Sequence, residues 1–570
     1  MAPLTKRPTT SKSLTLITYL FLTFFASLAI YWLRPPEVQT LCSPSQEFSA
    51  QRAMKLLETI ARRPHPAGSP EHREVEIFIR QELTRMGLTP IVHEAIGVPK
   101  RGSASIYNVH NILAKLPGRA STKSVLLAAH YDSVLGSPGA SDDGAAVGAL
   151  LETLRALGTG YPLKNNLILL LTDGEELGLL GAKAFIEDHP WSKDIGIVLN
   201  FEARGTSGPV LMFETSSGNG WLIQEFAKSS PFPVANSLMY EIYRLMPNDT
   251  DFTVFKKAGL SGLNFAFIDD WANYHTKHDT LETLDQRSLQ HHGSYALALT
   301  RHFGNLDLKN TKSTDAVYFN CFGSRLVVYS VKWVMPLMAL VGSLFAGMTL
   351  LGFKKGQLDL FGIAIGWVAL AVCIIVALLI VTSLLHTLRA VYAYSDWAPW
   401  KSPPHTKLYM MGIVALTFGI TAGMYEVFLK WTRLQNLTIG ALLWWLIVGT
   451  LVSWYTPGGS YLFVWPMLFN IAISGVLIST RQPTSISIGR LSIMLVCMVP
   501  SILLLVPMIY LTLVGLTLSS AGPAIILLVL FLGLLIPVLG IVDATVKWFV
   551  PVATLLAGFS FIAAGSVMRA

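Results

Sequence analysis

Charged residues are scarce in this chain. Asp, Glu, Lys and Arg make up 14% of its 570 residues, whereas 52% of the residues are hydrophobic. An ordinary soluble protein has roughly 25% charged residues. The composition therefore excludes a wholly soluble protein and indicates that much of the chain lies in a lipid bilayer.

Acidic residues are rare outside one segment. Residues 41–322 contain 26 Lys and Arg against 30 Asp and Glu, whereas the rest of the chain contains 17 against 5. The net charge of +8 therefore arises beside the apolar runs, where Lys and Arg set the orientation and meet anionic lipid. The basic balance gives no support to nucleic-acid binding.

Cysteine is also scarce, with four residues in all. Cys42, Cys321, Cys373 and Cys497 form neither a Cys-x-x-Cys zinc site nor a dense disulfide framework. Cys42 and Cys321 lie near the two ends of the acidic segment. They either form a disulfide in an oxidising compartment or are two unpaired thiols.

The first long apolar run covers residues 13–33 and follows Lys6, Arg7 and Lys12. It is long enough to cross about 30 Å of hydrocarbon. A cleaved signal peptide is the rival interpretation, but the run exceeds a typical h-region of roughly 7–15 residues and ends on bulky residues. We therefore predict a cytosolic tail at 1–12 and a transmembrane helix at 13–33.

Eight further apolar runs predict a transmembrane domain at 326–567. Pro500 and Pro507 interrupt one long run, which predicts either one kinked helix or a helix followed by a re-entrant segment. The runs cover 326–352, 360–386, 408–429, 438–455, 461–480, 489–518, 521–541 and 547–567.

Basic residues predict the orientation of these spans. If the N-terminus is cytosolic, two of the opposite loops, 456–460 and 519–522, carry no charge, and the loop at 387–407 is an exception with three basic residues. The cytosolic loops then hold Lys354, Lys355, Lys430, Arg433, Arg481, Arg490 and Lys547. The positive-inside rule thus predicts an extracytosolic segment at 40–322, in which Asn248 begins a glycosylation sequon.

Strand-like and helix-like patterns alternate within 40–322, which predicts an α/β domain. Short apolar runs at 125–129, 167–171, 195–199 and 263–268 are typical of buried strands. Amphipathic segments at 69–86, 145–157 and 178–188 are typical of the helices that cover them.

Histidines and carboxylates follow the ends of these strands. His130 comes directly after the first strand, and Asp132 is placed to orient its imidazole. Asp142 and Asp143 precede a helix, where capping worth about 0.3–1 kcal/mol is an alternative explanation for an acidic pair.

Two later motifs add more ligand types. Glu175 and Glu176 stand side by side after an apolar strand, and adjacent carboxylates that are both ionised call for a nearby cation. Glu202 ends the next strand, and the motif Tyr-His-Thr-Lys-His-Asp-Thr offers both His275 and His278. The spacing alone does not choose between these two histidines.

In order, these motifs resemble the dizinc, co-catalytic aminopeptidase family with the zinc-exopeptidase fold. The resemblance covers roughly residues 50–305 and includes Gly-Ala-Ser-Asp-Asp-Gly-Ala with Glu152 ten residues after Asp142, and Thr-Asp-Gly-Glu-Glu-Leu-Gly. The stretches 63–71 and 247–252 are similar to a membrane branch that contains the vacuolar membrane protease and the endoplasmic reticulum metallopeptidase. The resemblance implies a mixed central sheet flanked by helices, between a first and a second transmembrane helix.

The resemblance also implies the site residues. Asp142 would bridge two Zn²⁺ ions, His130 and Glu202 would complete one ion, and Glu176 and His275 the other. Many relatives have Asp in place of Glu202. Catalysis would fall to Glu175 as the general base and Tyr274 as the stabiliser of the oxyanion, while the structural or surface histidines would be His65, His110, His278, His291 and His292.

These features predict a membrane-bound zinc aminopeptidase with a peptide substrate. Its domain would face a periplasm in a bacterium, or a vacuolar or endoplasmic reticulum lumen in a eukaryote. One alternative is a zinc acyltransferase of the glutaminyl cyclase kind with a single zinc ion. The other is a non-catalytic receptor or transporter, which is disfavoured because the spans at 360–386, 461–480 and 491–541 contain no Asp, Glu, Lys or Arg.

Overall fold

The computed structural model describes residues 10–99, 106–158, 160, 162–323, 325–391, 405–479, 486–542, 544 and 546–567. Most of the predicted tail, with Lys6 and Arg7, lies outside these residues, as do Lys401 and Arg481. The chain forms two compact units. We call Leu33–Val331 the α/β unit, and Met1–Trp32 together with Lys332–Ala570 the helical unit.

Seven strands of the α/β unit form one mixed sheet in the order β1-β2-β4-β3-β5-β7-β6. Strands β4, β3, β5 and β7 are parallel to one another, whereas β1, β2 and β6 are added antiparallel. Their bounds are β1 Ile91–Gly97, β2 Tyr107–Leu116, β3 Ser124–His130, β4 Leu167–Thr172, β5 Ile195–Ala203, β6 Leu211–Thr215 and β7 Ser261–Phe267. The predicted mixed sheet is confirmed.

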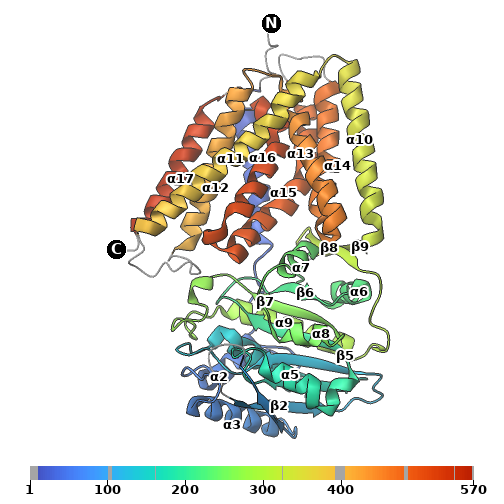
Figure 1. The fold of residues 1–570 in the computed structure, drawn as a ribbon, viewed down its shortest axis with the longest axis vertical. Coiled ribbons are helices and arrows are strands. Elements are labelled where there is room, and N and C mark those ends of the chain that lie inside the picture. Colours follow the sequence, from blue (N-terminus) through green and yellow to red (C-terminus); the bar gives the residue numbers. More distant parts are fainter. Residues whose placement is uncertain are drawn as a thin grey trace. The chain divides into compact units, whose positions relative to one another are not determined.

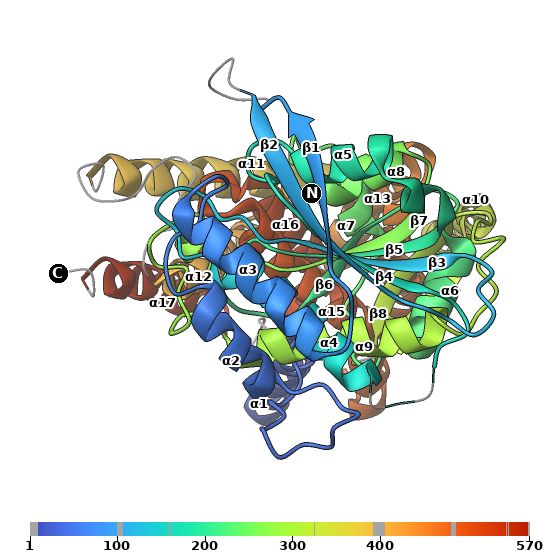
Figure 2. The ribbon, with the colours of Figure 1, turned by 90° about the horizontal axis from the view of Figure 1, so that it is seen from below.

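Helices cover both faces of this sheet because its central strands are apolar on both sides (Figures 1 and 2). Leu127 and Leu169 pack on the face covered by α2, α4 and α9, whereas Leu126 and Leu170 pack on the face covered by α5 and α8. The helices are α2 Ala50–Ile60, α3 Pro70–Arg85, α4 Ala146–Gly158, α5 Leu180–Asp188, α6 Gly220–Ser229, α7 Ser237–Tyr243, α8 Asp251–Lys257 and α9 Gln286–Phe303, with short turns η1 Ala140–Ala145, η2 Pro190–Asp194 and η3 Trp271–Asn273.

The α/β unit extends further than the sequence predicted. Residues 326–330 belong to an apolar run that we assigned to the membrane, but they form most of β9 Arg325–Ser330. This strand pairs antiparallel with β8 Ala316–Cys321. The boundary prediction was wrong here because a short apolar run suits a sheet as well as a membrane span. Cys42 and Cys321 are free thiols in the structure.

In the helical unit, nine helices within the described residues are long and apolar enough to cross a membrane. They are α1 Lys12–Tyr31, α10 Val334–Lys354, α11 Leu360–Val391, α12 Thr406–Phe428, α13 Leu434–Tyr455, α14 Tyr461–Ser479, α15 Ile488–Leu516, α16 Gly522–Val542 and α17 Phe549–Val567, with short turns η4 Val331–Trp333, η5 Pro457–Gly459 and η6 Leu518–Ser520. These helices support the prediction of a membrane protein.

Two details of the helical unit follow from particular residues. The run with Pro500 and Pro507 forms the single helix α15, so no re-entrant segment is present within it. Gly366 of α11 and Gly440 of α13 let two backbones meet, since a Cβ on Gly440 would lie 2.4 Å from the carbonyl carbon of Gly366. Small residues at such crossings allow the close packing that holds membrane helices together.

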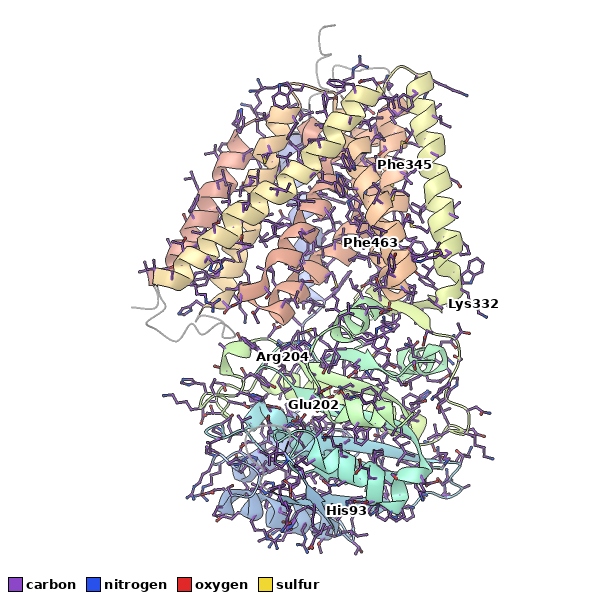
Figure 3. All side chains as sticks on the ribbon, viewed as in Figure 1. His93, Glu202, Arg204, Lys332, Phe345 and Phe463 are labelled. Carbon is purple, nitrogen blue, oxygen red and sulfur yellow. The ribbon has the colours of Figure 1, made fainter. Side chains whose placement is uncertain are left out.

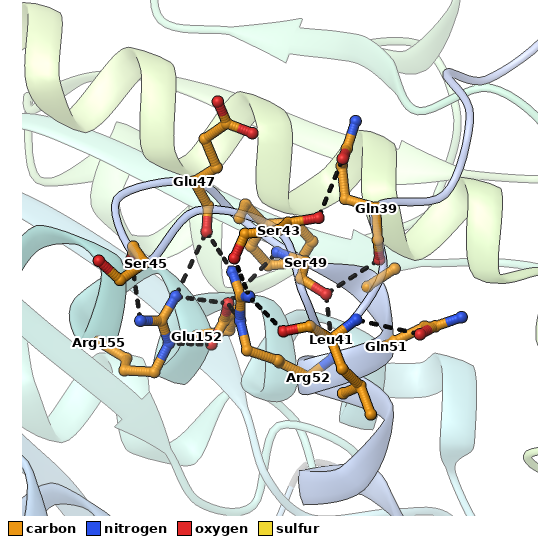
Figure 4. Close-up of polar contacts among 12 residues, drawn as sticks. Gln39, Leu41, Ser43, Ser45, Glu47, Ser49, Gln51, Arg52, Glu152 and Arg155 are labelled. Atoms are coloured by element: carbon orange, nitrogen blue, oxygen red, sulfur yellow. Dashed lines mark hydrogen bonds and ion pairs between the residues drawn. The ribbon is translucent and has the colours of Figure 1, made fainter.

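Glu152 of α4 anchors the segment that enters the α/β unit (Figure 4). Its carboxylate is buried, accepts a hydrogen bond from Arg52 Nε at 2.7 Å, and also binds Arg155 Nε at 2.6 Å. Arg52 Nη1 then donates to the carbonyl oxygens of Leu41 and Ser43. Glu152 therefore has a structural role, although it belongs to the motif around Asp142.

We expect Glu152→Gln to loosen this anchor. The substitution leaves two partly buried guanidinium groups without their carboxylate, a type of change that costs about 3–5 kcal/mol. Since both arginines are partly exposed, we expect about 3 kcal/mol. Amide hydrogen exchange of the full chain in detergent measures this as a lower opening free energy of α2 and α4.

The pair of Glu82 and Arg85 on α3, in which the Arg85 side chain is exposed, provides the control. Glu82→Gln should change the opening free energy by less than about 1 kcal/mol because solvent screens such pairs. An equal effect of the two substitutions would contradict the anchoring role of Glu152.

Candidate metal centre

The parallel strands deliver the predicted ligands to one edge of the sheet. His130 is the last residue of β3, and Glu202 is the penultimate residue of β5, where it is marked in Figure 3. Glu175 and Glu176 lie in the turn after β4. Because β3 pairs in parallel with both β4 and β5, these carboxyl-terminal ends are neighbours. Open α/β sheets commonly place their ligand sites at this edge.

Asp142 reaches the same place from the turn η1, which precedes α4. Its backbone is not helical, with φ −108° and ψ 94°, and its peptide bond to Asp143 is cis. Gly139 begins the turn with φ +66°, where a Cβ would lie 2.7 Å from the carbonyl oxygen of Asp142. The acidic pair therefore lies ahead of the helix, and the turn directs Asp142 toward the strand ends.

The two carboxylate oxygens of Asp142 face different histidines. Oδ1 lies 3.3 Å from His130 Nε2, and Oδ2 lies 2.9 Å from His275 Nε2. Glu202 Oε2 lies 3.7 Å from His130 Nε2, and Glu176 Oε1 lies 3.0 Å from His275 Nε2. The structure thus brings all five predicted ligands into two groups that share Asp142.

The donors in each group fit a zinc ion. Two ligands about 2.1 Å from one ion at a tetrahedral angle lie about 3.4 Å apart, and imidazole nitrogen with carboxylate oxygen is a common zinc donor set. The spacings of 2.9–3.7 Å lie around this value. Glu176 Oε1 is also buried and lacks a hydrogen-bond partner despite its closeness to His275. An ion between Glu176 Oε1 and His275 Nε2 would give both atoms a partner.

His130 is held in the tautomer that a metal requires. Its Nδ1 lies 2.9 Å from the carbonyl oxygen of Asp132, which can only accept, so Nδ1 carries the proton and Nε2 offers its lone pair. The main chain of Asp132 therefore orients the imidazole more closely than its carboxylate, which lies 3.5 Å away. That carboxylate accepts instead from the backbone N–H groups of Glu175 and Glu176, at 3.1 and 3.3 Å.

Two acids that the sequence reasoning missed also position the site. The carboxylate of Asp279 is buried and accepts from the backbone N–H groups of Ser141 and Asp142, at 2.8 and 3.1 Å. Burial and the charge of Asp142 raise the pKa of Asp279 to about 6. Asp143 accepts from the backbone N–H of His130 at 3.2 Å. Asp279 lies in the motif of His275, but the sequence does not indicate this contact.

Burial also shapes the electrostatics of the carboxylates. Burial raises the pKa of Glu202 to about 8. His130 opposes this shift, and the negative charges of Asp251 and Asp142 add to it. Burial and the charge of Asp142 raise the pKa of Glu176 to about 7. Burial likewise raises the pKa of Glu175 well above its usual range, against the opposing effect of His130. So many buried acids are stable as anions only beside cations.

Tyr274 and His275 approach from the turn after η3. Their rings stack with centroids 3.8 Å apart, and His275 adopts φ +57°, a left-handed conformation that is costly for histidine. Burial and neighbouring carboxylates raise the pKa of Tyr274 well above its usual range, so its hydroxyl stays a donor. The His275 side chain is 36% exposed and that of His130 is 1% exposed, so the cluster opens to solvent beside His275.

The other histidines lie outside the two ligand groups. His278 is exposed and His110 is partly buried. His65 is buried and donates through Nδ1 to the carbonyl oxygen of Arg63, and His291 and His292 are buried in α9. The structure therefore resolves the choice between the two histidines of the last motif in favour of His275, the one that reaches Asp142.

Comparisons with known proteins match the part of the chain that contains this cluster. Residues 111–300, which include all five clustered ligands, match the model of Peptidase family M28. Endoplasmic reticulum metallopeptidase 1 of Homo sapiens is 30% identical over 330 residues, which cover 54% of this chain and 36% of that protein. The vacuolar membrane protease of Eremothecium gossypii is 33% identical over 324 residues, which cover 52% of this chain and 32% of that protein.

Solved structures that match part of this chain include an aminopeptidase from Aneurinibacillus, at 14% identity and a TM-score of 0.37 over 48% of this chain and 98% of that one. They also include a glutaminyl cyclase from Porphyromonas gingivalis, at 19% identity and a TM-score of 0.38 over 45% of this chain and 97% of that one.

The chain spans about a third of the length of the curated relatives that it matches. Within that span, the family match and the ligand cluster cover the same residues. Residues 111–300 of this membrane protein are therefore similar to Peptidase family M28 and hold the cluster of candidate metal ligands.

Proposed function

We propose that this protein is a membrane-bound aminopeptidase that removes N-terminal residues from peptides with two zinc ions. The observation that carries the proposal is the position of Asp142, whose two oxygens face two separate histidines. One zinc ion would be held by His130, Asp142 and Glu202, and the other by Asp142, Glu176 and His275. When bound, the two ions supply Lewis acidity and a water of lowered pKa.

Glu175 is placed to act as the general base. A ligand atom of its carboxylate lies within 4.8 Å of those of His130 and Glu176, and its side chain is only partly buried. Glu175 therefore takes a proton from the attacking water and returns it to the amine that leaves, a role worth about 10²–10⁴-fold in rate.

Tyr274, which directly precedes the ligand His275, is placed to assist the same reaction. Its hydroxyl remains protonated, so it donates a hydrogen bond to the carbonyl oxygen of the substrate as that oxygen gains negative charge. The carboxylates of the cluster also attract cations. A free N-terminus carries a positive ammonium group, and this complementarity supports cleavage at the first peptide bond rather than inside a peptide.

A peptide panel tests the specificity. We expect the full-length protein in detergent to cleave the first bond of peptides with a free amine and to leave their N-acetylated forms intact, because the blocked amine has lost its charge. A chelator should abolish cleavage, and added zinc should restore it. Equal cleavage of the acetylated peptides would exclude an aminopeptidase, and cyclisation of N-terminal glutamine without hydrolysis would indicate an acyltransferase.

Two substitutions separate the base from the bridge. Glu175→Gln should lower kcat by about 10²–10⁴-fold and keep two zinc ions per chain, because it removes the base but no ligand. Asp142→Asn should lose both zinc and activity. Elemental analysis and peptide assays measure these effects, with Glu58→Gln on the exposed face of α2 as the control. Loss of zinc from the first variant, or two zinc ions in the second, would contradict these roles.

We further propose that the N-terminus is cytosolic and that the α/β unit is extracytosolic, as the distribution of basic residues favours. Cys42 offers a direct test because its thiol is exposed, whereas Cys373 is buried. A membrane-impermeant maleimide should label the protein from the extracytosolic side, and Cys42→Ser should lower this labelling. Labelling of Cys42 from the cytosolic side alone would reverse the orientation.

A further inference from the structure

Three buried polar side chains on neighbouring strands lead to Glu202, one of the candidate ligands. Asn200 of β5 lies opposite Asn264 of β7 in the sheet register, and Asn264 lies opposite Glu214 of β6. We call Glu214, Asn264 and Asn200 the polar chain. Asn200 and Glu202 stand two residues apart on β5, so their side chains share a face of the sheet. The register therefore places the polar chain and the ligand on one face.

A β-bulge in β6 puts a carboxylate at the far end of the polar chain. The pairing of β6 with β7 shifts register between Met212 and Glu214, so Glu214 rather than Phe213 lies opposite Asn264. Bulges commonly re-aim a side chain next to an active site. Lys256 of α8 forms an ion pair with Glu214, and the lysine side chain is 26% exposed. The polar chain thus begins at a carboxylate whose position is fixed by a charged partner.

The hydrogen bonds of the polar chain run in a defined direction. Asn264 Nδ2 donates to Glu214 Oε2 at 3.1 Å and to Thr250 Oγ1 at 3.0 Å. Asn264 Oδ1 is then left to accept, and Asn200 Nδ2 donates to it at 3.0 Å. The same Nδ2 donates to Glu202 Oε1 at 3.2 Å. Because a carboxylate can only accept, Glu214 sets the orientation of both amide groups.

This arrangement occupies one oxygen of Glu202 and leaves the other for a metal. The second oxygen, Oε2, is the one that lies 3.7 Å from His130 Nε2. Asn200 Oδ1 has no partner among the described residues, but turning this amide over would put that oxygen against two acceptors. The polar chain is at most 1% exposed and lies beside an apolar core, where polar groups are costly. Its position is explained by the ligand at its end.

We propose that the polar chain positions Glu202 as a ligand through one oxygen and thereby strengthens the zinc ion that Glu202 holds. The proposal rests on the dizinc centre of the proposed function. Hydrogen-bond partners of metal ligands of this kind contribute roughly 10–100-fold in metal affinity. Asn200, Asn264 and Glu214 are therefore positioning residues, which act on the metal through Glu202.

Zinc titration of the full-length protein in detergent, after a chelator has removed its metal, tests this role without any substrate. We expect Asn200→Leu to weaken one of the two zinc ions by roughly 10–100-fold, because Glu202 loses the donor that fixes it. The other ion should keep its affinity. Zinc buffers with elemental analysis give the two dissociation constants, and thermal melting in the presence of chelator checks that each variant folds.

Two substitutions of Glu214 separate orientation from packing. Glu214→Leu removes the acceptor that orients both amides, and should weaken the same ion by roughly tenfold, the lower end of that range. Glu214→Gln keeps an oxygen that can accept from Asn264 Nδ2, so it should keep the zinc affinity of the unmodified protein. Equal losses in these two variants would contradict the orienting role of Glu214.

Asn165→Leu is the matched control. Asn165 is also fully buried, and its Nδ2 also donates twice, to the carbonyl oxygens of Phe303 and Leu306. It precedes β4, at the edge of the sheet opposite the metal centre, so Asn165→Leu should lower the melting temperature and leave both zinc affinities unchanged.

The same titration distinguishes failure of this proposal from failure of the proposed function. Unchanged zinc affinity in Asn200→Leu would overturn the positioning role. A single zinc ion in the unmodified protein would instead contradict the dizinc function, and the effect of Asn200→Leu on that one ion would still decide the role of the polar chain.

Discussion

The α/β unit depends on holding several carboxylates close together at one edge of a sheet. Asp142 lies between two histidines, and Glu202 and Glu176 complete the two groups. Carboxylates repel one another at these distances, and burial raises the cost of their charges. The surrounding structure resists this repulsion by fixing the backbone at His130, Asp142 and Glu176. Bound divalent cations would make the same arrangement favourable.

Buried carboxylates fix the ligand backbone by accepting hydrogen bonds from its N–H groups. Asp279 holds the turn of Asp142, Asp132 holds the turn of Glu175 and Glu176, and Asp143 holds the end of β3. Each of these acids accepts from a main-chain N–H group, so the ligand side chains remain free to face the centre. Ligand positions that are fixed in this way need little rearrangement when an ion binds.

The two units use polar groups under opposite constraints. In the α/β unit, helices cover both faces of the sheet, and the acids converge where the strands end. In the helical unit, the packing depends on apolar side chains and on close approaches such as that of Gly366 to Gly440.

The sequence by itself determined the apolar spans, the α/β alternation and the order of the ligand motifs, because hydrophobic length and periodicity are local properties. It also named the five clustered residues, through their resemblance to a family. Only the tertiary structure assigned Asp279 to the support of the turn and put residues 326–330 in a strand. Those outcomes depend on contacts between residues far apart in the chain or on which strand is available for pairing. A local sequence pattern contains neither kind of information.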